Sequence, residues 1–226
     1  ITAMTFLEKF EQLAADGVEE LLYLSINSTG SATNSNAQAA RAMFLDEHPD
    51  STMEIAVVDS HTYSMAYGIF VLMAAKKMQN GAELCDTVSY LVEQFQKVEI
   101  ILSVHSLKII KKSGRVSAAA AFAGELMGLR PIITLIQGKT QVIRKVRGDA
   151  KILPTLCEHL TQHAAERTPY LIGGTRGIAD KHGDARSLSK LCEKAMGYPP
   201  ALTFSLGAAI TSNTGTDAIA IVYLNA

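Results

Sequence analysis

The sequence predicts an α/β protein with two lobes, a parallel α/β lobe followed by an α+β lobe with a mostly antiparallel sheet. Short apolar runs alternate with helical patterns in the first part, as in βαβ units, and a hairpin signal lies among the helices of the second part. The 226 residues are 48% hydrophobic and 19% charged, which is typical of a soluble globular chain. We place the boundary near Phe95, which gives lobes of residues 1–95 and 96–226.

The first lobe begins with apolar residues at helical spacing, and Thr5 and Glu8 resemble a capping box for that helix. Gly17 is expected to close it. Residues 20–25 and 54–59 are short and apolar, as buried parallel strands are. A polar loop and an Ala-rich helix follow the first strand, and helices are expected at about 65–78 and 84–95.

The second lobe contains a predicted β-hairpin around the turn 137–139. The same patterns predict its other elements: strands at 98–104, 132–136, 140–146, 170–172, 203–210 and 218–223, and helices at 107–111, 118–127, 153–167 and 187–195. Hairpins mixed with helices favour an antiparallel arrangement.

Charge, apolar stretches and cysteine content indicate which partners and which cellular compartment are expected for this chain. Lys and Arg number 21 against 22 for Asp and Glu, which gives a net charge of −1, and we expect no basic excess in either half of the chain, so nucleic acid is not an expected partner. The longest uncharged apolar stretch, residues 62–75, is too short for a transmembrane segment. Cys85, Cys157 and Cys192 are scattered, which favours reduced thiols in a cytoplasmic protein, each buried as a small hydrophobe. The chain opens directly into a helix without Met, so we expect its beginning to be missing.

Several motif-like patterns are weak. Gly138-Lys139-Thr140 resembles the end of a phosphate-binding loop but lies in a hairpin. His159 and His163 are spaced i,i+4 without the Glu of a zinc-protease motif, so no metal site is expected. A Gly-x-Ser-x-Gly nucleophile elbow is absent from the sequence.

The loop 27–36 is the strongest candidate site, because it follows the carboxyl end of a predicted parallel strand. Its hydroxyl and amide side chains, together with a helix N-terminus, suit a carboxylate or phosphate. Such residues are also ordinary loop and N-cap residues, and the residues alone slightly favour that interpretation. Ser60 and Ser64, after the second strand, are expected at the same sheet edge.

Basic residues form two further groups. Lys111, Lys112 and Arg115 either bind a phosphate or form a solvated helix end, and Lys145 and Arg147 face either a cleft or water. His182-Gly183-Asp184 is interpreted as a turn before the next helix.

Several segments, in order, resemble the DegV family of bacterial fatty-acid-binding proteins over nearly the whole chain. They are the serine-rich loop 25–37, Val58-Asp59-Ser60 with 64–68, the segment 107–117 ending Ser113-Gly114-Arg115-Val116-Ser117, Leu129-Arg130-Pro131, Gly138, and Lys145-Val146-Arg147.

This resemblance implies a Rossmann-like lobe, an α+β lobe, and a long-chain fatty acid buried between the two. It implies that hydroxyl groups hold the carboxylate, with Ser31 as the best match, accompanied by Thr33, Ser64 and the basic Arg147. It also implies a non-enzymatic carrier, with no cofactor besides the bound acid, that presents the acid to a partner fatty-acid kinase.

The sequence departs from the family pattern in the serine-rich loop, where Ala32 and Asn34 replace the usual Gly and Tyr, and at two further positions. Asn213 stands where the family has a headgroup histidine, and Asn cannot become cationic near neutral pH. Thr2 is what remains of an early Thr-Ser motif and is the weakest candidate for a carboxylate ligand.

The alternative function is an enzyme acting on a small carboxylated or phosphorylated metabolite at the carboxyl edge of the parallel sheet. Its candidate bases, Asp59, His61 and His182, form no dyad recognisable from the sequence.

Overall fold

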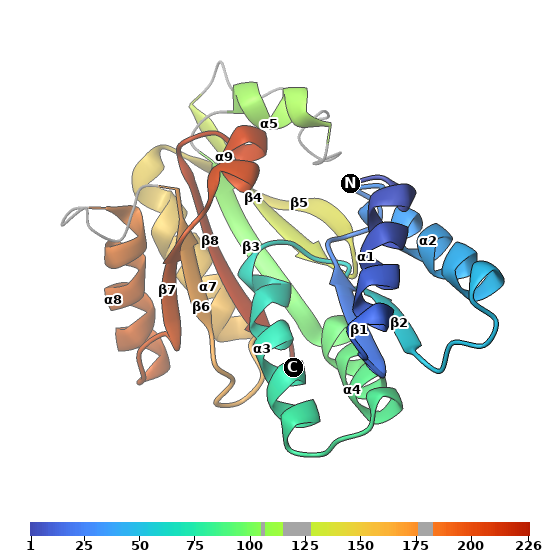
Figure 1. Cartoon of the computed structure of the whole chain (residues 1–226). Helices are drawn as coiled ribbons and strands as arrows, with labels where there is room; N and C mark the ends of the chain where they lie inside the picture. The colour runs from blue at the N-terminus through green and yellow to red at the C-terminus, as the bar shows by residue number, and fades with distance from the viewer. Residues whose placement is uncertain (105–106, 115–127, 176–182) are drawn as a thin grey trace. The chain divides into compact units, whose positions relative to one another are not determined.

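The computed structural model describes residues 1–104, 107–114, 128–175 and 183–226 (Figure 1). It divides into two compact units, one of Ile1–Tyr63 and Tyr67–Gln96 and one of Ser64–Ala66 and Lys97–Ala226. The first has a small parallel sheet and the second a larger mixed sheet, which confirms the predicted fold class. The predicted helix at 118–127 lies outside the described residues.

The first unit is built on two parallel strands in direct register, with Glu20 opposite Glu54 and Ser25 opposite Asp59. Its elements in chain order are α1 (Ala3–Ala15), β1 (Glu20–Ser25), α2 (Thr33–Glu47), β2 (Glu54–Asp59), α3 (Met65–Gln79) and α4 (Leu84–Lys97), of which α3 begins and α4 ends in residues grouped with the second unit. Both strands have the predicted bounds.

Helices α1 and α2 pack together on these strands. Phe6 and Phe10 of α1 join Phe44 of α2 and Ile55 of β2 in one buried cluster. The capping prediction for α1 is wrong by one turn: Thr2, not Thr5, is the N-cap, because its Oγ1 accepts the backbone N–H of Thr5 at 3.2 Å.

The second unit contains a six-stranded sheet in the order β5-β4-β3-β8-β6-β7, antiparallel except between β6 and β7. Its elements are β3 (Val98–Val104), α5 (Leu107–Ser113), β4 (Leu129–Ile136), β5 (Lys139–Arg147), the 3-10 turn η2 (Asp149–Lys151), α7 (Ile152–His163), β6 (Leu171–Gly174), α8 (Asp184–Met196), β7 (Leu202–Ser205), α9 (Ala208–Thr214) and β8 (Ala218–Leu224).

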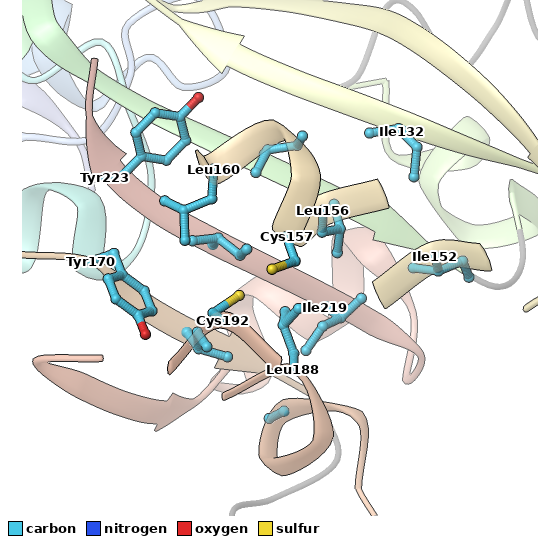
Figure 2. Packing of buried hydrophobic residues seen from close by; sticks show 14 of the residues in the cluster. Ile132, Ile152, Leu156, Cys157, Leu160, Tyr170, Leu188, Cys192, Ile219 and Tyr223 are labelled. Atoms are coloured by element: carbon cyan, nitrogen blue, oxygen red, sulfur yellow. The ribbon is translucent and has the colours of Figure 1, made fainter. Parts of the chain in front are cut away.

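Adjacent residues of β4 show that both faces of this sheet are covered. Ile132 is buried with α7 and α8, whereas Ile133 is buried with Ile110 of α5. Because side chains alternate along a strand, the two isoleucines belong to opposite faces. Figure 2 shows the α7–α8 side, where the sulfur atoms of Cys157 and Cys192 point toward each other.

Two predicted elements extend well past the observed ones, whereas the other described elements differ by a few residues at most. The strand expected at 203–210 stops at Ser205, because its partner β6 ends at Gly174, and α9 begins at Ala208. Helix α7 ends at His163 instead of 167, since Ala164 turns extended and pairs with Asn225 in an isolated bridge.

Strand β5 forms one edge of the described sheet. It carries Lys139, Arg144, Lys145 and Arg147, all exposed. Its register against β4 slips by one residue, since Ile132 lies opposite Arg144 but Ile133 lies opposite Val142. The edge is therefore basic and interrupted by a bulge.

Charge divides unequally between the two units. Of the 21 Lys and Arg residues of the sequence, 17 lie in the second unit, together with 9 of the 22 Asp and Glu residues. The first unit is thus acidic and the second basic. The expectation that neither half of the chain has a basic excess is therefore wrong for the second unit, and the net charge of −1 describes only the chain as a whole.

Candidate functional site

A polar edge lies where β1 and β2 end together in the first unit. Because Ser25 and Asp59 are opposite each other in the parallel register, the loops that follow them start at one edge of the sheet. The backbone N–H of Ser60 donates to the Ser25 carbonyl, and that of Asn27 donates to the Thr62 carbonyl, at 3.1 and 3.0 Å. The two loops are therefore hydrogen-bonded to each other.

Asn27 is the buried centre of this edge, with 1% of its surface exposed. Its Oδ1 accepts both the backbone N–H and the hydroxyl of Thr29, and its Nδ2 donates to the Tyr63 hydroxyl at 3.2 Å. Tyr63 in turn packs against Gly30, where a Cβ atom would collide with its hydroxyl. The side chain of the buried Asn27 is thus paired, which holds residues 27–30 in a defined shape.

Asp59 joins the two loops through its carboxylate. It accepts the backbone N–H groups of Ser28 and His61 and lies 3.1 Å from His61 Nδ1. Two of the candidate bases, Asp59 and His61, therefore form a carboxylate–imidazole pair that was not recognisable from the sequence. The pairing depends on a positive φ of 53° at His61, which spacing in the sequence does not reveal. His182 lies outside the described residues.

The structure brings Ser31 and Thr33 together. Their side-chain oxygens are 2.6 Å apart, and both residues are half-buried. They flank Ala32, the N-cap residue of α2, which makes no side-chain capping bond. The Ser31 Oγ also accepts the backbone N–H of Thr33, the first residue of α2, at 3.3 Å, so the hydroxyl pair lies directly at the N-terminus of this helix.

Two other candidate ligands, Ser64 and Thr2, lie in different local structures. Ser64 has a positive φ of 56° just before α3, and it is grouped with the second unit. Thr2 caps α1 and lies 2.9 Å from the hydroxyl oxygen of Thr5. Thr2 thus has a structural role of its own.

Arg147 and Asn213 lie in the second unit. Arg147 ends β5 and lines an open pocket of about 460 Å³ with Lys145 and Lys151. The Asn213 amide donates to the carbonyl of Ala209 within α9, at 2.8 Å. Arg115 and Ser117, from the segment that resembles the family most specifically, lie outside the described residues.

Sequence reasoning missed a polar cluster in the second unit. Glu99 of β3 is buried, and its Oε1 accepts bonds from the Thr134 hydroxyl and His159 Nε2. The available signal was an acidic residue inside an otherwise apolar strand, Val98–Val104. Such a residue requires partners on the neighbouring elements.

The cysteines differ in exposure. Cys157 and Cys192 are buried, as expected, but Cys85 is exposed, which corrects the prediction that all three are buried. Burial raises the pKa values of the Cys157 and Cys192 thiols. The inert pair is on α7 and α8, and the accessible thiol is on α4.

One acidic and histidine cluster lies among the described residues of the first unit. The side chains of Glu11, Glu47 and His48 bring three potential ligand atoms within 4.8 Å of one another. These side chains are mostly exposed, and Glu11 and His48 already pair at 3.1 Å.

Across the described segments, no helix combines the length and hydropathy needed to cross a membrane.

Comparisons with known proteins place this arrangement in a family. A family model described as "uncharacterised protein, DegV family" matches residues 1–226. A DegV domain-containing protein of Clostridium acetobutylicum is 30% identical over 209 residues, which cover 91% of this chain and 70% of the relative.

Two solved structures share the fold. A fatty acid binding DegV family protein of Streptococcus agalactiae is 27% identical, with a TM-score of 0.84 over 98% of this chain and 75% of the other. A DegV family protein of Thermus thermophilus, described by its fatty acid binding, is 26% identical, with a TM-score of 0.80 over 99% and 77%. With its two sheets, its serine-rich loop and a family match along its full length, the chain belongs to the DegV family.

Proposed function

We propose that this protein binds a long-chain fatty acid without catalysing a reaction. Two related proteins of the same fold, 26% and 27% identical to it, are described as fatty acid binding. A site for such a ligand needs an apolar wall and a few placed polar groups. We also propose, as the family resemblance suggests, that the acyl chain lies between the two lobes.

The observation that carries this proposal is the pair of hydroxyls on Ser31 and Thr33. Two hydroxyl groups contain two protons, and a contact of 2.6 Å between their oxygens uses one of them. The second proton remains free to donate to a carboxylate. A half-buried carboxylate without such donors would lose binding free energy or take up a proton.

The remaining candidate ligands are proposed with different support. Arg147 supplies positive charge at the end of β5, and Ser64 supplies a hydroxyl in a strained turn. The Asn213 amide nitrogen donates to the Ala209 carbonyl at 2.8 Å and to the Ser212 hydroxyl at 3.4 Å, so Asn213 would need to give up one of these bonds to donate to a ligand. The Thr2 hydroxyl already caps α1 by accepting the backbone N–H of Thr5, so we rank Thr2 last.

We further propose that the protein presents the bound carboxylate to a partner fatty-acid kinase in the cytoplasm. The support is the resemblance of the serine-rich loop and of Lys145-Val146-Arg147 to family motifs. Free thiols fit a reducing compartment. Replacement of the family histidine by Asn213 makes kinase coupling the part of the proposal most in need of an assay.

Native mass spectrometry of the purified chain, followed by denaturing lipid extraction, tests the proposal. We expect one fatty acid per chain, either retained from the host or taken up when oleate is added. A chain that is purified empty and that also fails to take up oleate would contradict the proposal.

The contact of 3.1 Å between the Asp59 carboxylate and Nδ1 of His61 favours a second candidate, an enzyme acting on a small carboxylated or phosphorylated metabolite. A carboxylate that orients an imidazole is a common general-base arrangement. This candidate predicts that a small carboxylate or phosphate, but not oleate, raises the thermal stability of the chain, and that His61→Gln removes the effect.

A further inference from the structure

Asn27 is a buried amide between the end of β1 and the hydroxyl pair of Ser31 and Thr33. Its exposed fraction is 1%, and it lies two residues after the last residue of β1. Its Oδ1 accepts the backbone N–H and the hydroxyl of Thr29, at 3.2 and 3.0 Å, and its Nδ2 donates to the Tyr63 hydroxyl at 3.2 Å. Because both ends of the amide are hydrogen-bonded, the side chain has one defined orientation.

The backbone of Asn27 restrains the same segment. Its carbonyl accepts the N–H of Gly30 at 3.1 Å, and its N–H donates to the Thr62 carbonyl at 3.0 Å. The first bond closes a turn over residues 27–30, and the second ties this turn to the loop that follows β2. Asn27 therefore holds the residues that directly precede Ser31 through both its side chain and its backbone.

Gly30 is restrained from a second side by the ring of Tyr63. A Cβ atom at Gly30 would collide with the Tyr63 hydroxyl and would lie 3.1 Å from Cζ of that ring. Since Asn27 donates to the same hydroxyl, the amide also sets the ring against Gly30. We call these three residues, Asn27, Gly30 and Tyr63, the amide clamp.

The hydroxyl pair begins at the residue after the clamp. Ser31 Oγ lies 2.6 Å from Thr33 Oγ1 and accepts the Thr33 N–H at 3.3 Å. Thr33 is the first residue of α2, so its N–H belongs to the turn that has no partner within the helix. A shift of Gly30 would move the adjacent Ser31 and lengthen both contacts.

We propose that Asn27 is a positioning residue for the Ser31–Thr33 hydroxyl pair. It acts through the amide clamp and does not itself touch the ligand. An amide suits this role because it both donates and accepts without placing a negative charge near a bound carboxylate. The inference rests on the proposed fatty-acid binding for its effect on affinity, whereas the effect on Ser31 is a property of the ligand-free chain.

A double-mutant cycle on oleate affinity tests the proposal. Asn27→Ala should weaken binding about 3–10-fold in the wild type and less than about twofold in a Ser31→Ala background, because its effect passes through Ser31. Equal losses in the two backgrounds would contradict the proposal. The exposed Asn80→Ala is the matched control and should leave the affinity unchanged.

Tyr63→Phe is a milder variant of the same test, and it serves where Asn27→Ala fails to fold. It keeps the ring but removes the hydroxyl that accepts from Asn27, so the same dependence on Ser31 is expected. Its control is Tyr90→Phe, which removes a hydroxyl that contacts Met73 Sδ at 3.8 Å. A Tyr63→Phe protein with the affinity of the wild type would overturn the role of the clamp.

Amide hydrogen exchange of the ligand-free chain, measured by NMR on the timescale of seconds, gives a second readout. Asn27→Ala and Tyr63→Phe should speed exchange of the Thr33 amide about 3–10-fold, because they weaken its bond to Ser31 Oγ. The amide of Ala40, buried in the middle of α2, should stay protected in every variant.

The two readouts separate this inference from the proposed function. A Thr33 amide that does not respond, or one that loses protection together with Ala40, would show that Asn27 does not act on the hydroxyl pair specifically. If the wild type binds no oleate but the Thr33 amide responds as expected, fatty-acid binding is wrong and the positioning role of Asn27 stands.

Discussion

The side-chain oxygens of Ser31 and Thr33 lie 2.6 Å apart at the start of α2. Such a pair acts as one donor toward a ligand, because each hydroxyl orients the other. Removing the Ser31 hydroxyl therefore leaves the Thr33 hydroxyl without this partner, whereas Ser31 also accepts the backbone N–H of Thr33.

Ser31→Ala should weaken oleate binding about 5–30-fold, since it removes one hydrogen bond to a carboxylate. Equilibrium binding of a fluorescent fatty acid measures this directly. Ser89→Ala is the matched control, because Ser89 is exposed and bonds only the Cys85 carbonyl of its own helix in the structure. If Ser31→Ala and the wild type bind the fatty acid with equal affinity, Ser31 is not a ligand of the carboxylate.

Asp59→Asn should lower the free energy of unfolding by about 1–3 kcal/mol. The carboxylate accepts two backbone N–H groups and pairs with His61, and an amide replaces one acceptor oxygen with a donor. Urea unfolding monitored by circular dichroism provides the measurement. The exposed Asp46→Asn serves as the control, and a similar small effect for both variants would show that the two loops do not depend on Asp59.

The buried Glu99 should make the free energy of unfolding depend on pH. Its pKa is lowered in the folded state from the ordinary value of 4.5, so the native state binds fewer protons than the unfolded state as pH falls through this range. The stabilisation is complete above about pH 4.5 and is lost as pH falls through the folded pKa. The advantage of the wild type over Glu99→Gln should be greatest at pH 6–7.

Urea unfolding midpoints between pH 3 and 7 check this behaviour. Glu158→Gln is the control, since its exposed pair with Arg144 should contribute little at any pH. A gap between wild type and Glu99→Gln that does not change with pH would show that Glu99 is not ionised in the native state.

One thiol per chain should react quickly with Ellman's reagent in the folded protein. Cys85 is exposed, whereas burial shields Cys157 and Cys192 and raises their thiol pKa values. The remaining two thiols should react after unfolding in urea. Cys85→Ser should remove the fast phase, and a fast phase that persists in this variant would show that α7 and α8 open readily.

Periodicity predicted the elements whose limits depend on local sequence. Strands β1, β2 and β3 have the predicted bounds because apolar runs end where polar loops begin. The boundary between β7 and α9 was not predictable in this way, since β7 ends where its partner β6 ends. Ala164 likewise leaves α7 to meet Asn225, some sixty residues away in sequence.

For the candidate site, the sequence predicted the position in the fold but not the contacts between its side chains. Its position followed from the polar loop after a parallel strand, but the contact of Asp59 with His61 required the left-handed backbone at His61. The charge of Glu99 became interpretable only once β4 and α7 supplied Thr134 and His159 as donors. The assignment of Ser31, Thr33, Ser64, Arg147, Asn213 and Thr2 as ligands stays a prediction.

The basic, bulged strand β5 has a consequence for concentrated solutions of the protein. A second copy that added its own β5 alongside would bring Arg144 and Lys145 near like charges, and the register slip at Ile132 and Ile133 would interrupt the ladder of hydrogen bonds. Strand-to-strand association along this edge is therefore disfavoured. The same lysines and arginines that make the second unit basic also protect its open sheet edge from fibril-like growth.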